Sequence, residues 1–229
     1  TASLHLALKS LGVKPSDKVI VPNYTCVSNL SAVNQCGATS ILVDIEKDTL
    51  GLDYELVKEA YKKYKPKYLQ LVHVYGFPAK DTHKIINFCK KNKIKIIEDT
   101  SEALGSTING KVVGSFGDIN VTSIRSEKMI GVGEGAIIST NYKKIFEKFT
   151  LLASRSAPFR TSKDPYWKKY FVSGEGYNYL MPHLLGSVAR GQIERFKKDL
   201  IKKKIKVGKI YVNELKKNNL KYGQQISNK

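Results

Sequence analysis

Three residue types that work together in cofactor chemistry lie close to one another in the chain. Asp99 directly follows the apolar run 95–98, Ser123 closes the run 119–123, and Lys128 comes five residues later. A lysine amine forms a Schiff base with a carbonyl group, a carboxylate keeps a pyridine nitrogen protonated, and a hydroxyl binds phosphate. Pyridoxal 5'-phosphate (PLP) needs all three groups, so this trio predicts a PLP site in which Lys128 is the catalytic residue.

A glycine-rich stretch, GVGEG at 131–135, follows the lysine. Its glycines allow tight backbone turns beside a ligand. Taken one at a time these signals are weak, because aspartates at strand ends commonly cap turns and glycine runs commonly form them. The order of the acid, the hydroxyl, the lysine and the glycines along the chain is what favours a common site.

Short apolar runs alternate with helical periods through most of the chain. The runs cover 18–21, 40–44, 68–74, 95–98, 119–123 and 136–139, and the helical periods cover roughly 26–36, 53–64, 79–92 and 142–153. This alternation predicts an α/β fold with a mostly parallel sheet covered by helices on both faces. Ligands of such sheets bind beyond the carboxyl ends of the strands, which is where Asp99 and Ser123 stand.

The two ends of the chain suggest a piece of a longer protein. Residues 1–8 already read as an amphipathic helix, without an initial methionine. Residues 155–180 lack periodicity and are expected to loop over the surface, and a helix is expected from about 182 to 215. We therefore divide the chain into a PLP-binding large domain at 1–181, with its N-terminal part missing, and a connecting helix with the start of a truncated small domain at 182–229.

The composition is that of a globular protein, with 229 residues of which 41% are hydrophobic and 26% charged. These proportions argue against a disordered or fibrous chain. No run of about 18 apolar residues predicts a membrane span, and no signal for secretion opens the chain. Cys26, Cys36 and Cys89 lack CxxC spacing and fit reduced thiols in the cytoplasm.

The net charge of +19 invites a nucleic-acid interpretation. Only five of the 39 basic residues are arginines, however. Base and phosphate recognition relies on arginine forks, whereas lysines spread over helix surfaces commonly reflect composition. We therefore expect no nucleic-acid partner; a nucleic-acid binder would show a steep salt dependence of binding.

Eight blocks of sequence, in order, resemble the DegT/DnrJ/EryC1/StrS family of PLP-dependent sugar aminotransferases, which have the fold of type I PLP-dependent transferases. The resemblance runs from Thr1 to about Phe196. The blocks are TASLHLAL (1–8), VPNYT (21–25), GAT with VDI (37–39 and 43–45), HVYG (73–76), IEDTSEALG (97–105), GSFGD (114–118), SIRSEK with GEG (123–128 and 133–135) and GYNY (176–179). Glu102 and the GEG block resemble the perosamine-synthase branch of the family.

The resemblance implies roles for residues around the cofactor ring. Lys128 would form the Schiff base and carry protons during transamination, and Asp99 would pair with the pyridine nitrogen. Ser101 would lie against one face of the ring, and Glu102 near its 3-hydroxyl edge. Cys26 stands where many members place an aromatic ring over the cofactor, and a thiol offers less stacking area.

Other residues are implied at the phosphate and at the subunit boundary. Thr1 and Ala2 would bind the phosphate at a helix N-terminus, and Ser123 would contact it too. Asn178 would reach across a homodimer interface to the phosphate of the neighbouring subunit, so that the two active sites are shared.

The chain also departs from the family's pattern. Glu102 replaces the commoner Gln or His, Leu180 stands where Arg is usual, and His183 stands where Asn or Asp is common. The last two changes bear on contacts near the substrate or the dimer seam. His73 is expected to be a core residue near a strand end.

The family implies a cytoplasmic aminotransferase that moves an amino group from glutamate to a nucleotide-linked 4-keto-6-deoxy sugar, in amino-sugar and surface-polysaccharide biosynthesis. Two alternatives keep the fold. A PLP-dependent sugar dehydratase carries histidine in place of the lysine, so Lys128 argues against it. A catalytically idle or regulatory homologue would not become yellow with PLP.

Overall fold

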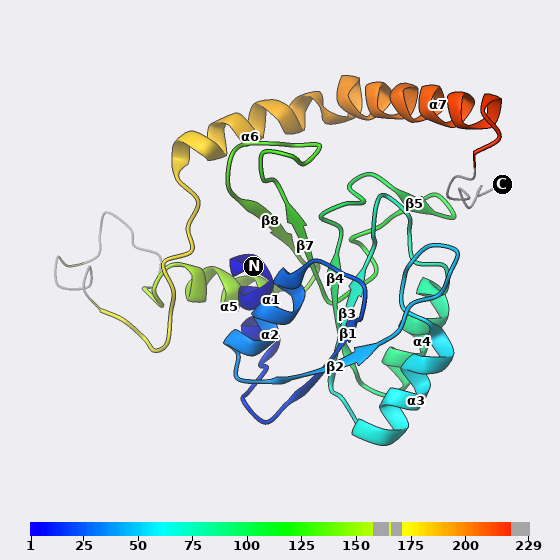
Figure 1. Cartoon of the computed structure of the whole chain (residues 1–229). Coiled ribbons are helices and arrows are strands. Elements are labelled where there is room, and N and C mark those ends of the chain that lie inside the picture. The colour runs from blue at the N-terminus through cyan, green and yellow to red at the C-terminus, as the bar shows by residue number, and fades with distance from the viewer. Residues whose placement is uncertain (158–164, 166–170, 221–229) are drawn as a thin grey trace.

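The structure is a computed structural model that describes residues 1–157, 165 and 171–220. Its centre is a six-stranded sheet in the order β2-β1-β3-β4-β7-β8 (Figure 1). Neighbours from β2 to β7 run parallel, and only β8 is antiparallel to its neighbour. The strands are β1 Lys18–Pro22, β2 Thr39–Val43, β3 Tyr68–Val72, β4 Lys95–Asp99, β7 Ile119–Ser123 and β8 Ala136–Ser139, with a separate hairpin of β5 Thr107–Ile108 and β6 Lys111–Val112.

Helices cover both faces of the sheet, as the alternation of runs predicts. One face carries α1 Ala2–Leu11, α2 Val27–Gln35 and α5 Lys143–Ala153, and the other carries α3 Tyr54–Tyr64 and α4 Thr82–Lys91. The predicted α/β fold, a mostly parallel sheet covered by helices on both faces, is confirmed.

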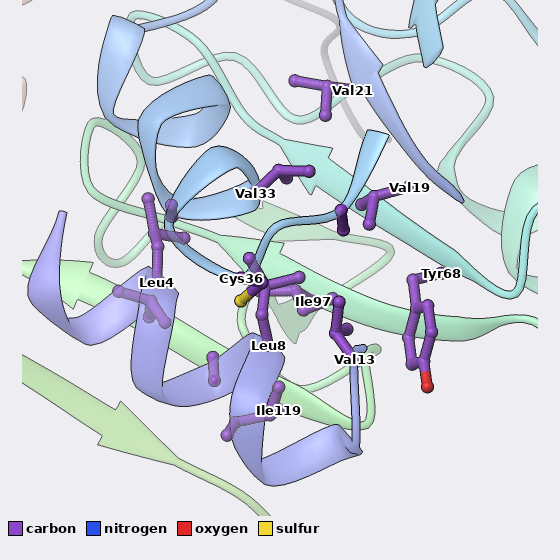
Figure 2. Close-up of a cluster of buried hydrophobic side chains, with 14 residues drawn as sticks. Leu4, Leu8, Val13, Val19, Val21, Val33, Cys36, Tyr68, Ile97 and Ile119 are labelled. Atoms are coloured by element: carbon purple, nitrogen blue, oxygen red, sulfur yellow. The ribbon is translucent and has the colours of Figure 1, made fainter. Parts of the chain in front are cut away.

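Alternating residues of the strands feed two separate cores. Val19 and Val21 of β1 lie in the core beneath α1 and α2, while Ile20 between them lies in the core beneath α3 and α4. Figure 2 shows Leu4 and Leu8 of α1 in the first of these cores. Each fully buried aliphatic side chain contributes roughly 1.5–3 kcal/mol, which holds the strand ends in place.

The predicted helix from about 182 to 215 forms nearly as expected. It consists of α6 His183–Arg195, a π-helical turn η2 Phe196–Leu200, and α7 Ile201–Lys217. α6 begins close to the predicted domain boundary, yet it packs against the main body through buried Ala189. The division into domains at 181 and 182 stays a prediction.

The predicted surface segment 155–180 lies partly outside the described residues; of those described, 171–176 are exposed. Within the described chain, no helix combines the length and apolar character needed to span a membrane.

Candidate cofactor site

A cavity of about 1030 Å³ opens at the carboxyl ends of the parallel strands. Loops that follow β1, β4 and β7 line it together with the start of α1. Eight of the nine predicted site residues line this cavity: Thr1, Ala2, Cys26, Asp99, Ser101, Glu102, Ser123 and Lys128. The fold therefore brings together residues as far apart along the chain as Thr1 and Lys128, because parallel strands place all their carboxyl ends at one edge.

Asp99, the last residue of β4, is a buried carboxylate held only by neutral donors. Its side chain is 4% exposed. Asn29 Nδ2 donates to Oδ2 at 3.1 Å, and the Ser101 amide donates to Oδ1 at 3.0 Å. No lysine, arginine or histidine of the described residues forms an ion pair with it. A buried carboxylate without a cationic partner is suited to a positively charged ring nitrogen.

Asn29 is a supporting residue that the sequence analysis missed. It lies in the first turn of α2 and is almost fully buried, at 1% exposure. Its backbone oxygen accepts a hydrogen bond from Gln70 Nε2 at 3.1 Å, and its Nδ2 also donates to Thr25 Oγ1 at 3.0 Å. The available signal was a polar residue on the sheet-facing side of an otherwise apolar helix stripe.

Lys128 lies in the loop after β7 with its amine directed at a carboxylate. Nζ is 3.5 Å from Glu102 Oε1, and the other oxygen of Glu102 accepts from the Tyr75 amide at 3.1 Å. The lysine side chain is 19% exposed, so it is largely sheltered but still open to the cavity. Glu102 thus holds the amine of Lys128 in the cavity that Asp99 also lines.

Backbone bonds and α6 hold the loop that carries this lysine. The Ile124 amide donates to the Gly135 oxygen, and the Gln192 side chain of α6 both accepts from the Gly131 amide at 3.1 Å and donates to its oxygen at 2.6 Å. A Cβ on Gly131 would lie 2.5 Å from the Ser126 oxygen. The loop therefore needs glycine at 131 for close packing of its own backbone.

The start of α1 offers free donors to an anion. The Thr1 carbonyl accepts from the His5 amide, and the Thr1 hydroxyl donates to Ser28 Oγ at 3.1 Å, so it caps nothing. In the described part of the chain, the amides of the first helical turn, 2–4, have no partner. Unpaired amides at a helix N-terminus attract phosphate through hydrogen bonds and the helix dipole.

Cys26 and two serines complete this end of the cavity. Cys26 Sγ contacts Ser28 Oγ at 3.3 Å, beside the helix start. Ser101 Oγ accepts from the Ser123 amide at 3.0 Å, which ties the end of β4 to the end of β7. Ser123 Oγ in turn accepts from the Arg125 amide at 3.4 Å and keeps its own proton to donate.

A buried pair below the cavity supports the end of β4. The Ala79 amide donates to His73 Nδ1 at 3.0 Å, so Nε2 carries the proton and donates to Glu98 Oε1 at 3.1 Å. Burial raises the pKa of Glu98, but hydrogen bonds from His73 and from the amides of Gly114 and Gly117 outweigh it and leave the pKa below its usual value. The expectation that His73 is a core residue is confirmed, since it is 1% exposed.

Asn178 does not line the cavity of its own chain. It is exposed, and its backbone forms an isolated antiparallel bridge with Ser154. The flanking Tyr177 and Tyr179 stack on each other with ring centroids 5.1 Å apart and both pack against His5 of α1. Side chains alternate along extended backbone, so Asn178 is directed away from the tyrosines and from α1.

Of the two other departures, Leu180 lines the cavity, whereas exposed His183 begins α6 outside it. The sequence analysis missed two tyrosines at the mouth. Tyr24, in the loop after β1, and Tyr75, in the loop after β3, form a hydrogen bond between their hydroxyls at 2.8 Å. This bond raises the pKa of Tyr75, whose backbone has a left-handed φ of 53°. Strained tyrosine backbone at a cavity commonly marks a functional position.

The residues present fit PLP at three points. Asp99 is a buried carboxylate without a cationic partner, the first turn of α1 has unpaired amides for a phosphate, and Lys128 presents a sheltered amine in the same cavity. Each group is of the type that the ring nitrogen, the phosphate or the aldehyde of PLP requires.

Comparisons with known proteins point the same way. The whole chain, residues 1–229, matches the model of the DegT/DnrJ/EryC1/StrS aminotransferase family. It is 35% identical over 215 residues to the GDP-perosamine synthase of Vibrio cholerae, a match that covers 94% of this chain and 56% of that protein. The chain therefore spans about half the length of this relative.

Solved structures share the fold. An aminotransferase from Psychrobacter cryohalolentis matches with a TM-score of 0.79 and 27% identity, over 86% of this chain and 50% of that one. The ntda protein of Bacillus subtilis, solved with the cofactor PMP, matches with a TM-score of 0.70 and 26% identity, over 81% of this chain and 40% of that one.

Proposed function

Because the chain belongs to the DegT/DnrJ/EryC1/StrS aminotransferase family, we propose that the full-length protein is a PLP-dependent aminotransferase acting on a nucleotide-linked sugar. Aminotransferases of this family use PLP. The observation that carries the proposal is the buried, cation-free carboxylate of Asp99 in one cavity with the amine of Lys128.

The chain's own residues divide the work of binding and proton transfer. PLP, when bound, supplies the electron sink that lets an amino group pass between an amine and a carbonyl compound. Asp99 would pair with the ring nitrogen of the cofactor, and Lys128 would hold the cofactor through Nζ and move a proton at that atom. Glu102 orients that Nζ and would lie near the ring edge that bears the hydroxyl.

The remaining residues position the cofactor. Thr1, Ala2 and the free amides of the first turn would bind the phosphate, with the Ser123 hydroxyl as a further donor. Ser101 would lie against one face of the ring and Cys26 against the other. Because a thiol covers less of the ring than an aromatic side chain, Cys26 gives weaker stacking than Tyr or Trp.

The finer part of the proposal concerns the substrates and the assembly. Similarity to a GDP-perosamine synthase supports a 4-keto-6-deoxy sugar linked to a nucleotide as acceptor, with glutamate as donor, in amino-sugar and surface-polysaccharide biosynthesis in the cytoplasm. The outward direction of Asn178 supports a homodimer in which this residue reaches the partner's phosphate. Residues 182–229 then begin the connection to a small C-terminal domain.

Borohydride reduction of the full-length protein with PLP tests the assignment. Peptide mapping should find the reduced cofactor on Lys128, and Lys128→Ala should abolish both the label and amino transfer from glutamate. Lys111→Ala is the matched control, because Lys111 is exposed and outside the cavity. A label on Lys111, or a protein that stays colourless and unlabelled with PLP, would contradict the proposed function.

A further inference from the structure

A second cavity, of about 680 Å³, adjoins the cofactor cavity at the catalytic lysine. Both cavities share Tyr75, Ser101, Glu102, Ser123, Glu127 and Lys128 as lining residues. The large cavity extends from Lys128 to Asp99 and the start of α1, the residues proposed to bind the cofactor. The small cavity extends from Lys128 in another direction, toward α7.

The outer wall of the small cavity is built by α7. Ile201, Lys204 and Ile205 face the segment 103–107 that follows β4. A Cβ on Gly105 would lie 2.7 Å from Ile201 Cδ1, and φ at this glycine is +88°. The helix therefore packs directly on the backbone here, and Figure 1 shows α7 running past the β5 hairpin. Close packing of this kind fixes where the side chains of α7 stand relative to Lys128.

The charges that line the small cavity leave one cation without a partner. Lys128 pairs with Glu102 at 3.5 Å, and Glu127 pairs with Arg125 at 3.7 Å. Among the described residues, Lys204 has no carboxylate within ion-pair distance. The neighbouring Lys203 differs, because it is bonded to Asp199 and does not line the cavity.

We propose that the small cavity binds the sugar of the acceptor substrate and that Lys204 binds the phosphate attached to that sugar. This inference rests on the proposed function, because a nucleotide-linked sugar carries a diphosphate on its ring. The volume of the small cavity lies within the usual range of small-molecule pockets, about 300–1000 Å³. A sugar there has its carbonyl beside Lys128 Nζ and its phosphate toward α7.

The chemistry of Lys204 suits this role. A lysine ammonium acts on phosphate as a compact point charge on a flexible stem, and needs no fixed fork geometry. The two glutamates of the lining are already engaged by other cations, so they do not neutralise it. The contact is with phosphate only, which makes Lys204 a binding residue that is indifferent to the base of the nucleotide.

Equilibrium binding of GDP and of UDP to the PLP-loaded, full-length protein tests the inference. Lys204→Gln should weaken both by about fivefold, which is the upper range for one exposed ion pair. Lys204→Glu should weaken both by about 25-fold, since repulsion of similar size replaces the attraction. Lys206→Gln is the matched control, because Lys206 lies on the same helix, forms no ion pair in the described chain and does not line the cavity.

The outcomes separate this inference from the proposed function. Unchanged GDP and UDP binding in Lys204→Glu, or an equal loss in Lys206→Gln, would overturn it. A Lys204→Glu protein that is labelled at Lys128 by reduction and transfers amino groups with the parental KM for the sugar acceptor would contradict the proposed subsite. That result would leave the proposed aminotransferase function supported. Loss of binding in Lys204→Glu, with retained PLP absorbance and unchanged binding in Lys206→Gln, supports it.

Discussion

Asp99→Asn keeps the shape of the buried side chain and removes its charge. The carboxylate accepts from Asn29 Nδ2 at 3.1 Å and from the Ser101 amide at 3.0 Å. An asparagine has one oxygen only, so its NH₂ group would face one of these donors. Asn29 can relieve that conflict by turning its amide, because its Oδ1 is buried without a partner and would accept from the new NH₂.

This exchange makes the expected stability loss small and the cofactor loss large. With the hydrogen bonds nearly restored, the free energy of unfolding of the apoprotein should fall by at most about 1 kcal/mol. The charge-assisted bond to a protonated ring nitrogen is worth roughly 1.5–3 kcal/mol, so PLP affinity should fall by about 10- to 150-fold. Amino transfer by the PLP-saturated variant should also be slow, because a neutral amide does not stabilise a pyridinium.

Absorbance titration with PLP, the rate of the half-reaction with glutamate and thermal unfolding of the apoprotein measure these quantities. Asp17→Asn is the matched control. Asp17 is also a buried carboxylate that accepts from a backbone amide, that of Lys14, but it precedes β1 at the opposite edge of the sheet. The Asp17→Asn variant should therefore be less stable than the parent but keep the parental affinity for PLP.

A single result would refute the reasoning about Asp99. An Asp99→Asn protein that folds, turns yellow at the parental PLP concentration and transaminates at the parental rate would show that Asp99 only holds the turn before Ser101. The carboxylate would then be a structural acceptor, and the cofactor ring would lie elsewhere in the cavity.

Three further predictions concern the interface, the buried acid and the lysine loop. Mixed Asn178→Ala and Lys128→Ala chains should regain activity as heterodimers; two inactive, dimeric parents that fail to complement would mean that each site is built within one chain. Glu98→Gln should lower the free energy of unfolding by about 1–3 kcal/mol at neutral pH. Because the folded pKa of Glu98 is depressed, its stabilisation is present above the unfolded value near 4.5 and is lost as pH falls, so denaturant titrations of parent and variant should converge in acid. Gly131→Ala places a Cβ 2.5 Å from a backbone oxygen and should weaken PLP retention and cost about 1–3 kcal/mol in denaturant unfolding, whereas Gly191→Ala in open helix should be neutral or stabilising.

Much of the fold and part of the site follow from local sequence patterns. The apolar runs are each long enough for one buried strand, and helical periods separate them. This pattern predicts a mostly parallel sheet covered on both faces, and the structure contains such a sheet. Strand polarity then places Asp99 and Ser123 at one edge without any knowledge of strand order. Gly131 could be recognised from the sequence as a turn residue. The sequence did not reveal why glycine is needed there, which is the close approach of the Ser126 backbone oxygen.

The sequence by itself determined which groups would meet at one edge of the sheet, because residues at the carboxyl ends of parallel strands share an edge whatever the order of those strands. Only the tertiary structure decided what supports and extends that edge. Three helices distant in sequence supply these groups: Asn29 donates a hydrogen bond to Asp99, Gln192 bonds the loop that carries Lys128, and Lys204 lines the second cavity. Their partners depend on how helices pack on the sheet, and that packing is set by the whole core together, with no local signal to reveal it.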